Sequence, residues 1–535
     1  MPSFWEAFDF RVINIVKGAV ALAATLLLAW DYLRPAAGSR PSLRAGWSAA
    51  LAVLGCLAFA GWWNFGHFHF PQYLQLHEHY HYYLGTKYFP EVGYTGLYDC
   101  VAAADVDDGL EAKVAGRWIR NLSTNRLERG SRNADARKQC KGRFSADRWN
   151  LFAQDVRWFR QRSGADWDIA FIDHGYNATP VWAMVPTLLI DASPVDEHQL
   201  QGLALIDPVL LLMMWGLVWW AFGWRGLCVA LIWWGTNYPA RFRWTGGALM
   251  RADWLVLSTA GICLMKRQWW AAGGAALMAA ALLRIFPGVL LLGWLLCVIG
   301  DLYRRHSLRL RPGQLRFSLG CAAAAVALLL LSAIVVGGSL RGGAEAWEGF
   351  AANSRKHLAT PLNNNIGFQT LLSFEPSSRA EKLSSYWIDA PWDTWTAARR
   401  RVSEDRRILY WVLVCAFVVA LARAVQHQPD WMAAILGLTL MPVALNVTCY
   451  YYAAFLLFGL VWGRDQRTGI ALAALAGLSN IVPALWTFED DIHVAISAAT
   501  LVFVVCVLIW NTRNDKAASR DHTVGIRDAD SLAGS

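Results

Sequence analysis

The sequence predicts an all-α protein that crosses a membrane many times. Of its 535 residues 56% are apolar, 30 are Trp, and long runs carry no charged side chain. Lipid offers the backbone no hydrogen-bond partners, so apolar runs of about 20 residues cross it as helices. About thirteen runs are apolar and long enough, or nearly so, to be predicted as transmembrane helices: 12–30, 45–63, 207–223, 226–238, 248–264, 269–283, 285–300, 317–336, 408–424, 431–448, 449–463, 468–486 and 492–510.

The first apolar run, 12–30, is predicted to stay in the membrane instead of being removed as a signal peptide. It has no small-residue cleavage site and leads directly into DYLRP at 31–35. We expect it to form a hairpin with 45–63. Residues 1–44 are therefore predicted to be an extra N-terminal segment followed by an inside loop.

Short basic loops predict the orientation. Loops rich in Lys and Arg stay in the cytoplasm, and counting from the loop at 304–316 places the other short basic loops on the same side. The two long inserts, 64–206 and 337–407, are then predicted on the outer face, and 511–535 forms a cytoplasmic tail. We expect a multi-pass protein of a cell inner membrane with its active site facing the periplasm.

The net charge of +9 is spread over these loops instead of being collected on one soluble face. The charge pattern therefore excludes a nucleic-acid-binding surface.

The first insert is too long for a connector and is predicted to fold. It opens with NFGHFHFPQYLQLHEHYHYYLGTKYFPEVGYTGLYDC at 64–100, in which several His and Tyr surround Glu78. Two interpretations are open: a water-facing site at the membrane surface, or aromatic anchors at the interface. Helical spacing predicts one helix along the membrane surface at 78–92 and another at 147–164, with Trp149, Phe152, Val156 and Phe159 on one stripe.

Cys100 and Cys140 are the two thiols of the outer inserts, whereas the other eight Cys lie in apolar runs. An oxidising compartment favours their pairing, and we predict a disulfide between them. The alternative is two unpaired, buried thiols. The Cys and His spacings match no zinc pattern, so no metal is predicted.

Arg284 is the most isolated charge of the chain, because apolar residues flank it on both sides in the turn between two predicted spans. A charge at that depth indicates a functional site. The alternative is an Arg at a helix end that extends to the interface. Arg251 and Asp253 lie near the membrane surface in an earlier outer turn.

The second insert is polar at 353–367, where Lys356, His357 and the run from Asn363 to Asn365 occur. These side chains are suited to bind a polar head group or a sugar. Ordinary turn chemistry explains them equally well. Tyr450, Tyr451 and Tyr452 at a later outer turn are predicted to be an interfacial belt.

From 45 onward, the order is one span, a large outer insert, six spans with short loops, a second large insert and further spans. This order resembles the shared module of the GT-C superfamily of membrane glycosyltransferases. The motifs resemble the branch around glycosyltransferase family 87, which uses polyprenol-phosphate-mannose. The matching stretches are Glu78 to Tyr82, Gly93 to Tyr98, Tyr176 to Pro180, and LRIFP at Leu283 to Pro287 in place of a K-x-x-P turn.

The resemblance covers residues 45–370, and 371–510 holds the rest of the second insert and the C-terminal helices. Two departures are Glu78, where the family has Asp, and Arg284, where Lys is common. The extra first span is a further departure.

The resemblance implies inverting transfer of a mannose-like sugar from a polyprenyl-phosphate donor to a hydroxyl of a glycan or glycolipid acceptor, without a cofactor, among membrane lipids. Such transfer needs a carboxylate base and cations that stabilise the leaving phosphate. The expected base is Glu78, with Asp173 and Asp99 next. The expected phosphate ligands are Arg284, Arg251, Lys356 and His357, and the expected substrate-binding residues are His79, Tyr82, Tyr83, Lys87, Asn364 and Asn365.

A multi-pass transporter or lipid-linked glycan flippase is the alternative function. Transporters commonly contain paired halves with interrupted helices at matching positions, and we find no such symmetry in the sequence. A ligase or polymerase of lipid-linked glycans shares the chemistry, but its main outer loop is expected late in the chain.

Overall fold

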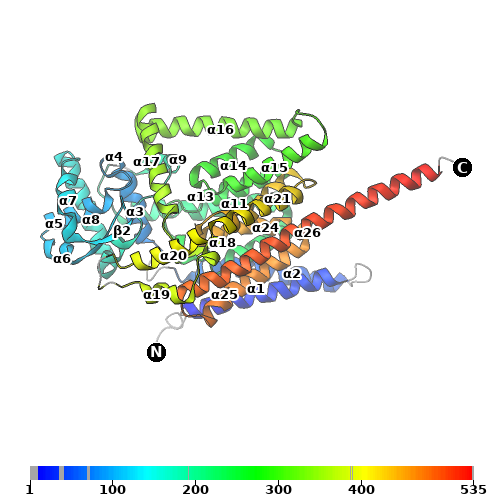
Figure 1. The fold of residues 1–535 in the computed structure, drawn as a ribbon, viewed down its shortest axis with the longest axis horizontal. Coiled ribbons are helices and arrows are strands. Elements are labelled where there is room, and N and C mark those ends of the chain that lie inside the picture. Colours follow the sequence, from blue (N-terminus) through cyan, green and yellow to red (C-terminus); the bar gives the residue numbers. More distant parts are fainter. Residues whose placement is uncertain are drawn as a thin grey trace.

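The structure is a computed structural model, and it describes residues 10–34, 41–68, 73–190, 192–385, 387 and 390–532. Most described residues are helical, as predicted, and a bundle of long helices carries a compact, mostly helical domain at one end (Figure 1). The bundle elements are α1 (Phe10–Leu33), α2 (Pro41–Trp62), α11 (Ile206–Thr236), α13 (Asp253–Lys266), α14 (Trp270–Arg284), α15 (Gly288–Arg304), α16 (Pro312–Gly337), α21 (Arg407–Ala424), α22 (Asp430–Gly437), η5 (Leu438–Leu440), α23 (Met441–Ala444), η6 (Cys449–Phe455), α24 (Leu456–Gly459), η7 (Leu460–Gly463), α25 (Gln466–Leu485) and α26 (Glu489–Leu532).

Within the described residues, 7 helices are long and apolar enough to cross a membrane, so the predicted number of thirteen is not confirmed. Several predicted spans correspond to shorter apolar helices, among them Trp270–Arg284, Asp430–Ala444 and Cys449–Gly463. A straight helix of that length does not reach across about 30 Å of hydrocarbon.

The runs predicted at 207–223 and 226–238 both lie in α11, where the chain reverses at Gly223. This glycine has φ 73° and ψ 175°, which are not helical angles. The rings of Trp215 and Trp234 are 5.2 Å apart, whereas an unbroken helix would separate these residues by about 28 Å. The sequence was therefore right to divide this stretch in two.

The first insert folds around α3 (Leu76–Lys87). Its other elements are η1 (Asn64–Gly66), α4 (Phe89–Val92), α5 (Leu97–Asp107), α6 (Glu111–Gly116), the antiparallel strands β1 (Trp118–Asn121) and β2 (Arg126–Arg129), η2 (Gly130–Asn133), α7 (Ala134–Lys141), α8 (Ala146–Ser163), η3 (Gly164–Ile172), α9 (Pro180–Leu189) and α10 (Glu197–Ala204). The predicted stripe of α8 is buried, and Gly164 follows the last helical residue. A disulfide joins Cys100 of α5 to Cys140 of α7, with their Cα atoms 5.4 Å apart.

The helix predicted along the membrane surface has a different environment in the structure. Residues 79–87 of α3 are all buried in protein. Aromatic rings pack on several sides of this helix: Tyr80 contacts Trp167 at 5.1 Å, and Tyr82 contacts Trp182 at 5.1 Å between ring centroids. A helix with large apolar rings on opposite faces requires partners all round, so α3 forms the centre of the insert instead of its edge.

The second insert consists of α17 (Leu340–Leu358), β3 (Asn365–Ile366), α18 (Phe368–Leu372), η4 (Pro376–Ser378), α19 (Ala380–Leu383) and α20 (Asp393–Asp405). Strand β3 pairs antiparallel with β4 (Val447–Thr448), which precedes η6 of the bundle. Arg399 and Arg379 form ion pairs with Asp490 and Asp491 at the start of α26. These contacts fix the polar residues 363–365 against the end of the bundle.

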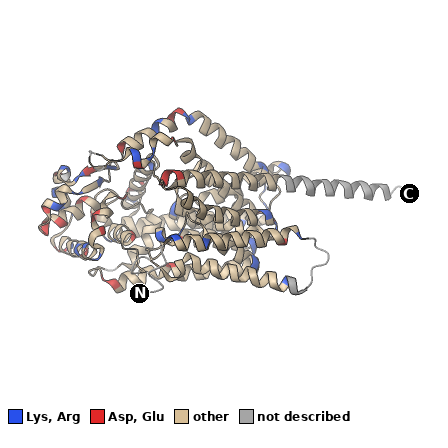
Figure 2. Cartoon of the chain, turned by 90° about the horizontal axis from the view of Figure 1, so that it is seen from below, with Lys and Arg blue, Asp and Glu red and all other residues tan. Residues whose placement is uncertain are grey.

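The inserts and the short basic loops lie at opposite ends of the bundle. Arg225 stacks on Trp47 near the start of α2, at 5.1 Å from the ring centroid, and Arg267 stacks on Trp220 at 4.9 Å. The start of α2, the α11 reversal and the end of α13 therefore share one end, which we call the basic end. Figure 2 shows Lys and Arg there, away from the inserts.

Cysteine labelling tests which end faces outward. We expect an impermeant maleimide to label Ser123→Cys of the first insert in intact cells and Leu308→Cys, which is 93% exposed at the basic end, only after lysis. The exposed Cys56 and Cys415 are replaced by Ser in both variants. Labelling of both positions before lysis would contradict the predicted orientation.

Candidate functional site

A cavity of about 790 Å³ lies where the two inserts meet the bundle, and we call it the polar cavity. It brings together residues that are far apart in the sequence. Its polar lining residues include His77, Glu78, Asp166, Asp173, His174, Asn177, Arg243, His357, Asn363, Asn364, Asn365, Asn446, Thr448, Tyr450 and Tyr451. Five of the predicted site residues therefore line one space: Glu78, Asp173, His357, Asn364 and Asn365.

Glu78 pairs with a buried cation at the wall of the polar cavity. Its Oε2 lies 3.2 Å from Nε of Arg251, and the two side chains are 16% and 4% exposed. Asp207 of α11 accepts hydrogen bonds from the backbone N–H groups of Arg251 and Ala252. The arginine is thus fixed at its backbone by the bundle and at its guanidinium by the first insert.

Arg251 and Arg284 meet at the ring of Tyr82. Their guanidinium carbons lie 4.7 Å and 5.8 Å from its centroid, and the Tyr82 hydroxyl donates to Oδ1 of Asn177 at 2.5 Å. Because Glu78 and Tyr82 both contact Arg251, they share the face of α3 that their spacing of four residues predicts. Tyr82 therefore reaches the site as a platform for two cations.

Arg284 has donors without protein partners. Its Nε and Nη2 are buried and make no hydrogen bond, although its guanidinium carbon also lies 5.4 Å from the Trp182 ring centroid. A buried donor without a partner is costly. The sequence alternative, an Arg extended to the interface, does not fit this position, because the two nitrogens are enclosed.

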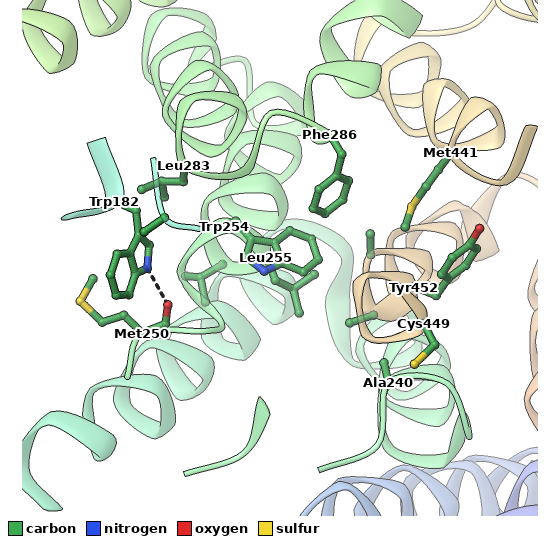
Figure 3. Packing of buried hydrophobic residues seen from close by; sticks show 14 of the residues in the cluster. Trp182, Ala240, Met250, Trp254, Leu255, Leu283, Phe286, Met441, Cys449 and Tyr452 are labelled. Carbon is green, nitrogen blue, oxygen red and sulfur yellow. Dashed lines mark hydrogen bonds between the residues drawn. The ribbon is translucent and has the colours of Figure 1, made fainter. Parts of the chain in front are cut away.

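A second, smaller cavity contains both guanidinium groups, and we call it the arginine pocket. It measures about 30 Å³, and Arg251 and Arg284 line it together with Asp207, Thr245 and aromatic and aliphatic residues of the bundle: Trp62, Leu211, Trp234, Trp254, Leu255, Tyr450 and Tyr451. Figure 3 shows the apolar packing beside it, where Trp182 donates from Nε1 to the carbonyl of Met250 at 2.9 Å. The two tyrosines line both this pocket and the polar cavity.

Asp173 accepts hydrogen bonds at both carboxylate oxygens. His77 Nε2 is 2.8 Å from Oδ2, and the backbone N–H of His174 is 2.7 Å from Oδ1. Arg120 donates to the carbonyls of Ile172 and Asp173 and so holds this loop. His77 was part of the conspicuous sequence stretch but was not predicted as a site residue.

The pair of His77 and Asp173 shifts the pKa of each partner. Burial lowers the pKa of His77, but the hydrogen bond to Asp173 and the charges of Asp173 and Glu78 outweigh it, so the pKa is raised. Burial raises the pKa of Asp173, and the hydrogen bond and charge of His77 reverse this, so the pKa lies well below its usual value. Asp173 is therefore ionised at neutral pH and is a weak base.

His77, His81 and Asp173 place ligand atoms within 4.8 Å of one another, a set that suits a metal ion. His81 is engaged elsewhere, since its Nδ1 lies 2.8 Å from the His77 carbonyl and its Nε2 lies 2.6 Å from the Tyr98 hydroxyl. A metal would have to displace one of these contacts.

Several predicted site residues do not line the polar cavity. Tyr83 donates to Gln199 at 2.5 Å, and Lys87 pairs with Asp155 at 2.8 Å inside the first insert. His79 makes a 3.2 Å hydrogen bond with the Gly247 carbonyl, and burial lowers its pKa to about 4. Tyr83 and Lys87 therefore stabilise the first insert, and His79 joins α3 to the turn before α13 of the bundle.

Asp99 and Lys356 also lie elsewhere. Burial raises the pKa of Asp99 to about 6, but this residue on α5 does not line the cavity. Lys356 donates to the Leu122 carbonyl and to Asn353, which anchors α17 on the first insert. His69, which belongs to the conspicuous stretch, falls outside the described residues.

Tyr450 and Tyr451 were predicted to be an interfacial belt, and the structure places both at the boundary of the two cavities. The Arg251 guanidinium lies 5.4 Å from the Tyr450 centroid. Three consecutive tyrosines were the available sequence signal, but composition alone favours the interface for them.

No protein-family model, curated protein or solved structure matches this chain. Its function is therefore inferred from the side chains of the polar cavity and the arginine pocket.

Asp173→Asn should lower the pKa of His77, because it removes the hydrogen bond and charge that oppose burial. Diethyl pyrocarbonate modifies neutral imidazole, so the pH of half-maximal modification of His77, read by peptide mass spectrometry, reports this pKa. In the wild type that pH should lie above about 6.5, the usual pKa of His, and in the variant it should fall below it. Asp166→Asn, which removes a more distant charge, should shift it less. Equal values in Asp173→Asn and the wild type would refute the coupling.

Proposed function

We propose that the protein is an inverting glycosyltransferase that moves a mannose-like sugar from a polyprenyl-phosphate donor to an acceptor hydroxyl at the outer face of a cell inner membrane. One observation supports this most directly: a carboxylate and two buried arginines meet where a polar cavity adjoins an apolar pocket. A lipid-linked sugar phosphate brings a sugar for the polar cavity and an anion for the two arginines.

The arginine pocket is suited to the donor phosphate. Arg251 and Arg284 present planar guanidinium groups, which bind phosphate oxygens through two parallel hydrogen bonds. Nη1 of Arg251 and two nitrogens of Arg284 are buried without partners, and a bound phosphate would satisfy them. As the bond to the sugar breaks, charge grows on that phosphate, and fixed cations stabilise the growing charge.

Glu78 is the best placed base. Both oxygens of Asp173 already accept hydrogen bonds, whereas Glu78 lines the polar cavity with one oxygen at Arg251. A phosphate that binds Arg251 competes with Glu78 for this cation and frees the carboxylate oxygen to face the acceptor. An acceptor hydroxyl in the polar cavity then loses its proton to Glu78 as it attacks the sugar.

The second insert supplies the remaining polar groups. His357 lines the polar cavity and has a buried Nε2 without a partner, and burial lowers its pKa to about 4. It is neutral at physiological pH and suited to a hydrogen bond with the sugar or phosphate. Asn364 and Asn365 face the same cavity and offer amide groups to sugar hydroxyls.

Glu78→Gln tests the base, because it keeps the size of the side chain and removes its basicity. We expect the transfer rate to fall about a hundredfold to ten-thousandfold in a membrane assay that follows sugar loss from the polyprenyl-phosphate donor. Glu111→Gln, at an exposed position on α6, serves as the matched control and should keep full activity. A Glu78→Gln protein that retains more than about a tenth of the rate would exclude Glu78 as the base. Movement of the intact lipid-linked glycan across the membrane, without transfer, would support the flippase alternative.

Arg284→Ala should weaken use of the donor by about tenfold to a hundredfold, the range for lost hydrogen bonds to a charged group. Arg284→Lys should recover part of the loss, because it restores the charge without the planar fork. The readout is KM for the donor in the same assay. Arg341→Ala, whose parent side chain is 91% exposed, is the control. Unchanged donor kinetics in Arg284→Ala would leave that arginine a structural role only.

A further inference from the structure

A third cavity lies beside the polar cavity in the second insert, and we call it the side pocket. It measures about 400 Å³ and lies between β3, α18, α20 and the start of α26. Leu362, Asn363 and Asn365 line both the side pocket and the polar cavity. The side pocket and the polar cavity are therefore adjacent and have part of their walls in common.

Buried polar atoms without partners occur on three residues that line the side pocket. They are the indole Nε1 of Trp395, Nε of Arg399 and Oδ1 of Asn365. The three residues are only 3%, 4% and 4% exposed. Leaving such atoms unsatisfied is costly, so the pocket is suited to a ligand that both donates and accepts hydrogen bonds.

Charge limits the class of ligand. Arg399 of the side pocket is paired with Asp490, and Arg400 donates to the Ala359 carbonyl at 2.7 Å. Asp490 and Glu404 also line the pocket and would repel an anion, while the arginines would repel a cation. A neutral polyhydroxylated ligand meets both conditions.

We propose that the side pocket binds a neutral sugar unit of the acceptor, one or more units away from the hydroxyl that is glycosylated. This inference rests on the proposed glycosyltransferase function and deepens it, because it makes the acceptor an oligosaccharide instead of a single sugar or a simple lipid alcohol. Binding energy gained away from the reacting atoms positions the hydroxyl at Glu78.

The test compares binding of short and long saccharides without donor or turnover. The probes are methyl mannoside, methyl glucoside and the linear tetrasaccharides of mannose and glucose, measured by saturation-transfer NMR on the purified full chain in detergent. We expect one tetrasaccharide to bind at least about tenfold tighter than its methyl glycoside. Trp395→Phe, which keeps a ring and removes the N–H, should reduce this preference about fivefold, the effect of one hydrogen bond.

Two further variants complete the design. Trp387→Phe changes a tryptophan of the same insert that is 95% exposed and should leave the preference unchanged. Ser403→Phe fills the side pocket from α20, with loss of the 3.4 Å hydrogen bond that Ser403 Oγ accepts from Gln369, and should abolish the preference even if Trp395→Phe fails to fold. Equal binding of short and long probes, no binding of any probe, or an unchanged preference in Ser403→Phe would overturn the proposal.

The outcomes separate this inference from the proposed function. Tetrasaccharide binding without sugar transfer would refute the glycosyltransferase and leave the side pocket as a saccharide site. Transfer with no dependence on acceptor length would refute the side pocket and leave the glycosyltransferase standing.

Discussion

The contact between Glu78 and Arg251 is the constraint on which the arrangement of the inserts depends. Arg251 is 6% exposed, and a buried cation that loses its partner destabilises a protein by about 3 to 5 kcal/mol. The bundle fixes the Arg251 backbone through Asp207, so the ion pair forms only where the first insert places Glu78 next to this arginine. Helix α3 therefore docks with its start at the end of the bundle, and the polar cavity forms beside that contact. Glu78 is therefore both the counter-ion that stabilises this arrangement and the proposed base.

Much of the local structure follows from sequence patterns, because those patterns depend on neighbours along the chain. The stripe on α8 is an example, since residues three or four apart necessarily share a face. The environment of α3 does not follow in the same way. Its aromatic residues indicate a helix equally well at a membrane surface or inside a domain, and only the packing of Trp167 and Trp182, far along the chain, decides between them.

Two faces of α3 explain why some of the predicted site residues lie at the site and others do not. Glu78 and Tyr82 are four residues apart and face Arg251, whereas Tyr83 and Lys87 form a second such pair about 100° around the helix. Lys87 Nζ lies 3.4 Å from the Tyr83 hydroxyl, and its counter-ion is Asp155 on α8. Spacing thus separates the two faces, but the identity of the face toward the cavity depends on contacts between distant segments.

The short helical pieces between 430 and 463 lie beside the polar cavity. A backbone inside a membrane protein is allowed to be irregular where protein groups or a polar cavity satisfy it, and here the second insert does so: the N–H of Cys449 donates to the Asn364 carbonyl at 3.0 Å, and β3 pairs with β4. The predicted helices 431–448 and 449–463 are instead divided into shorter pieces, and Cys449 is the first residue of η6, where the backbone N–H has no helical carbonyl one turn earlier and is free to bond Asn364. The break between 444 and 449 lets β4 pair with β3, which holds Asn365 at the wall of the side pocket. After the same break, Tyr450 and Tyr451 lie between the polar cavity and the arginine pocket.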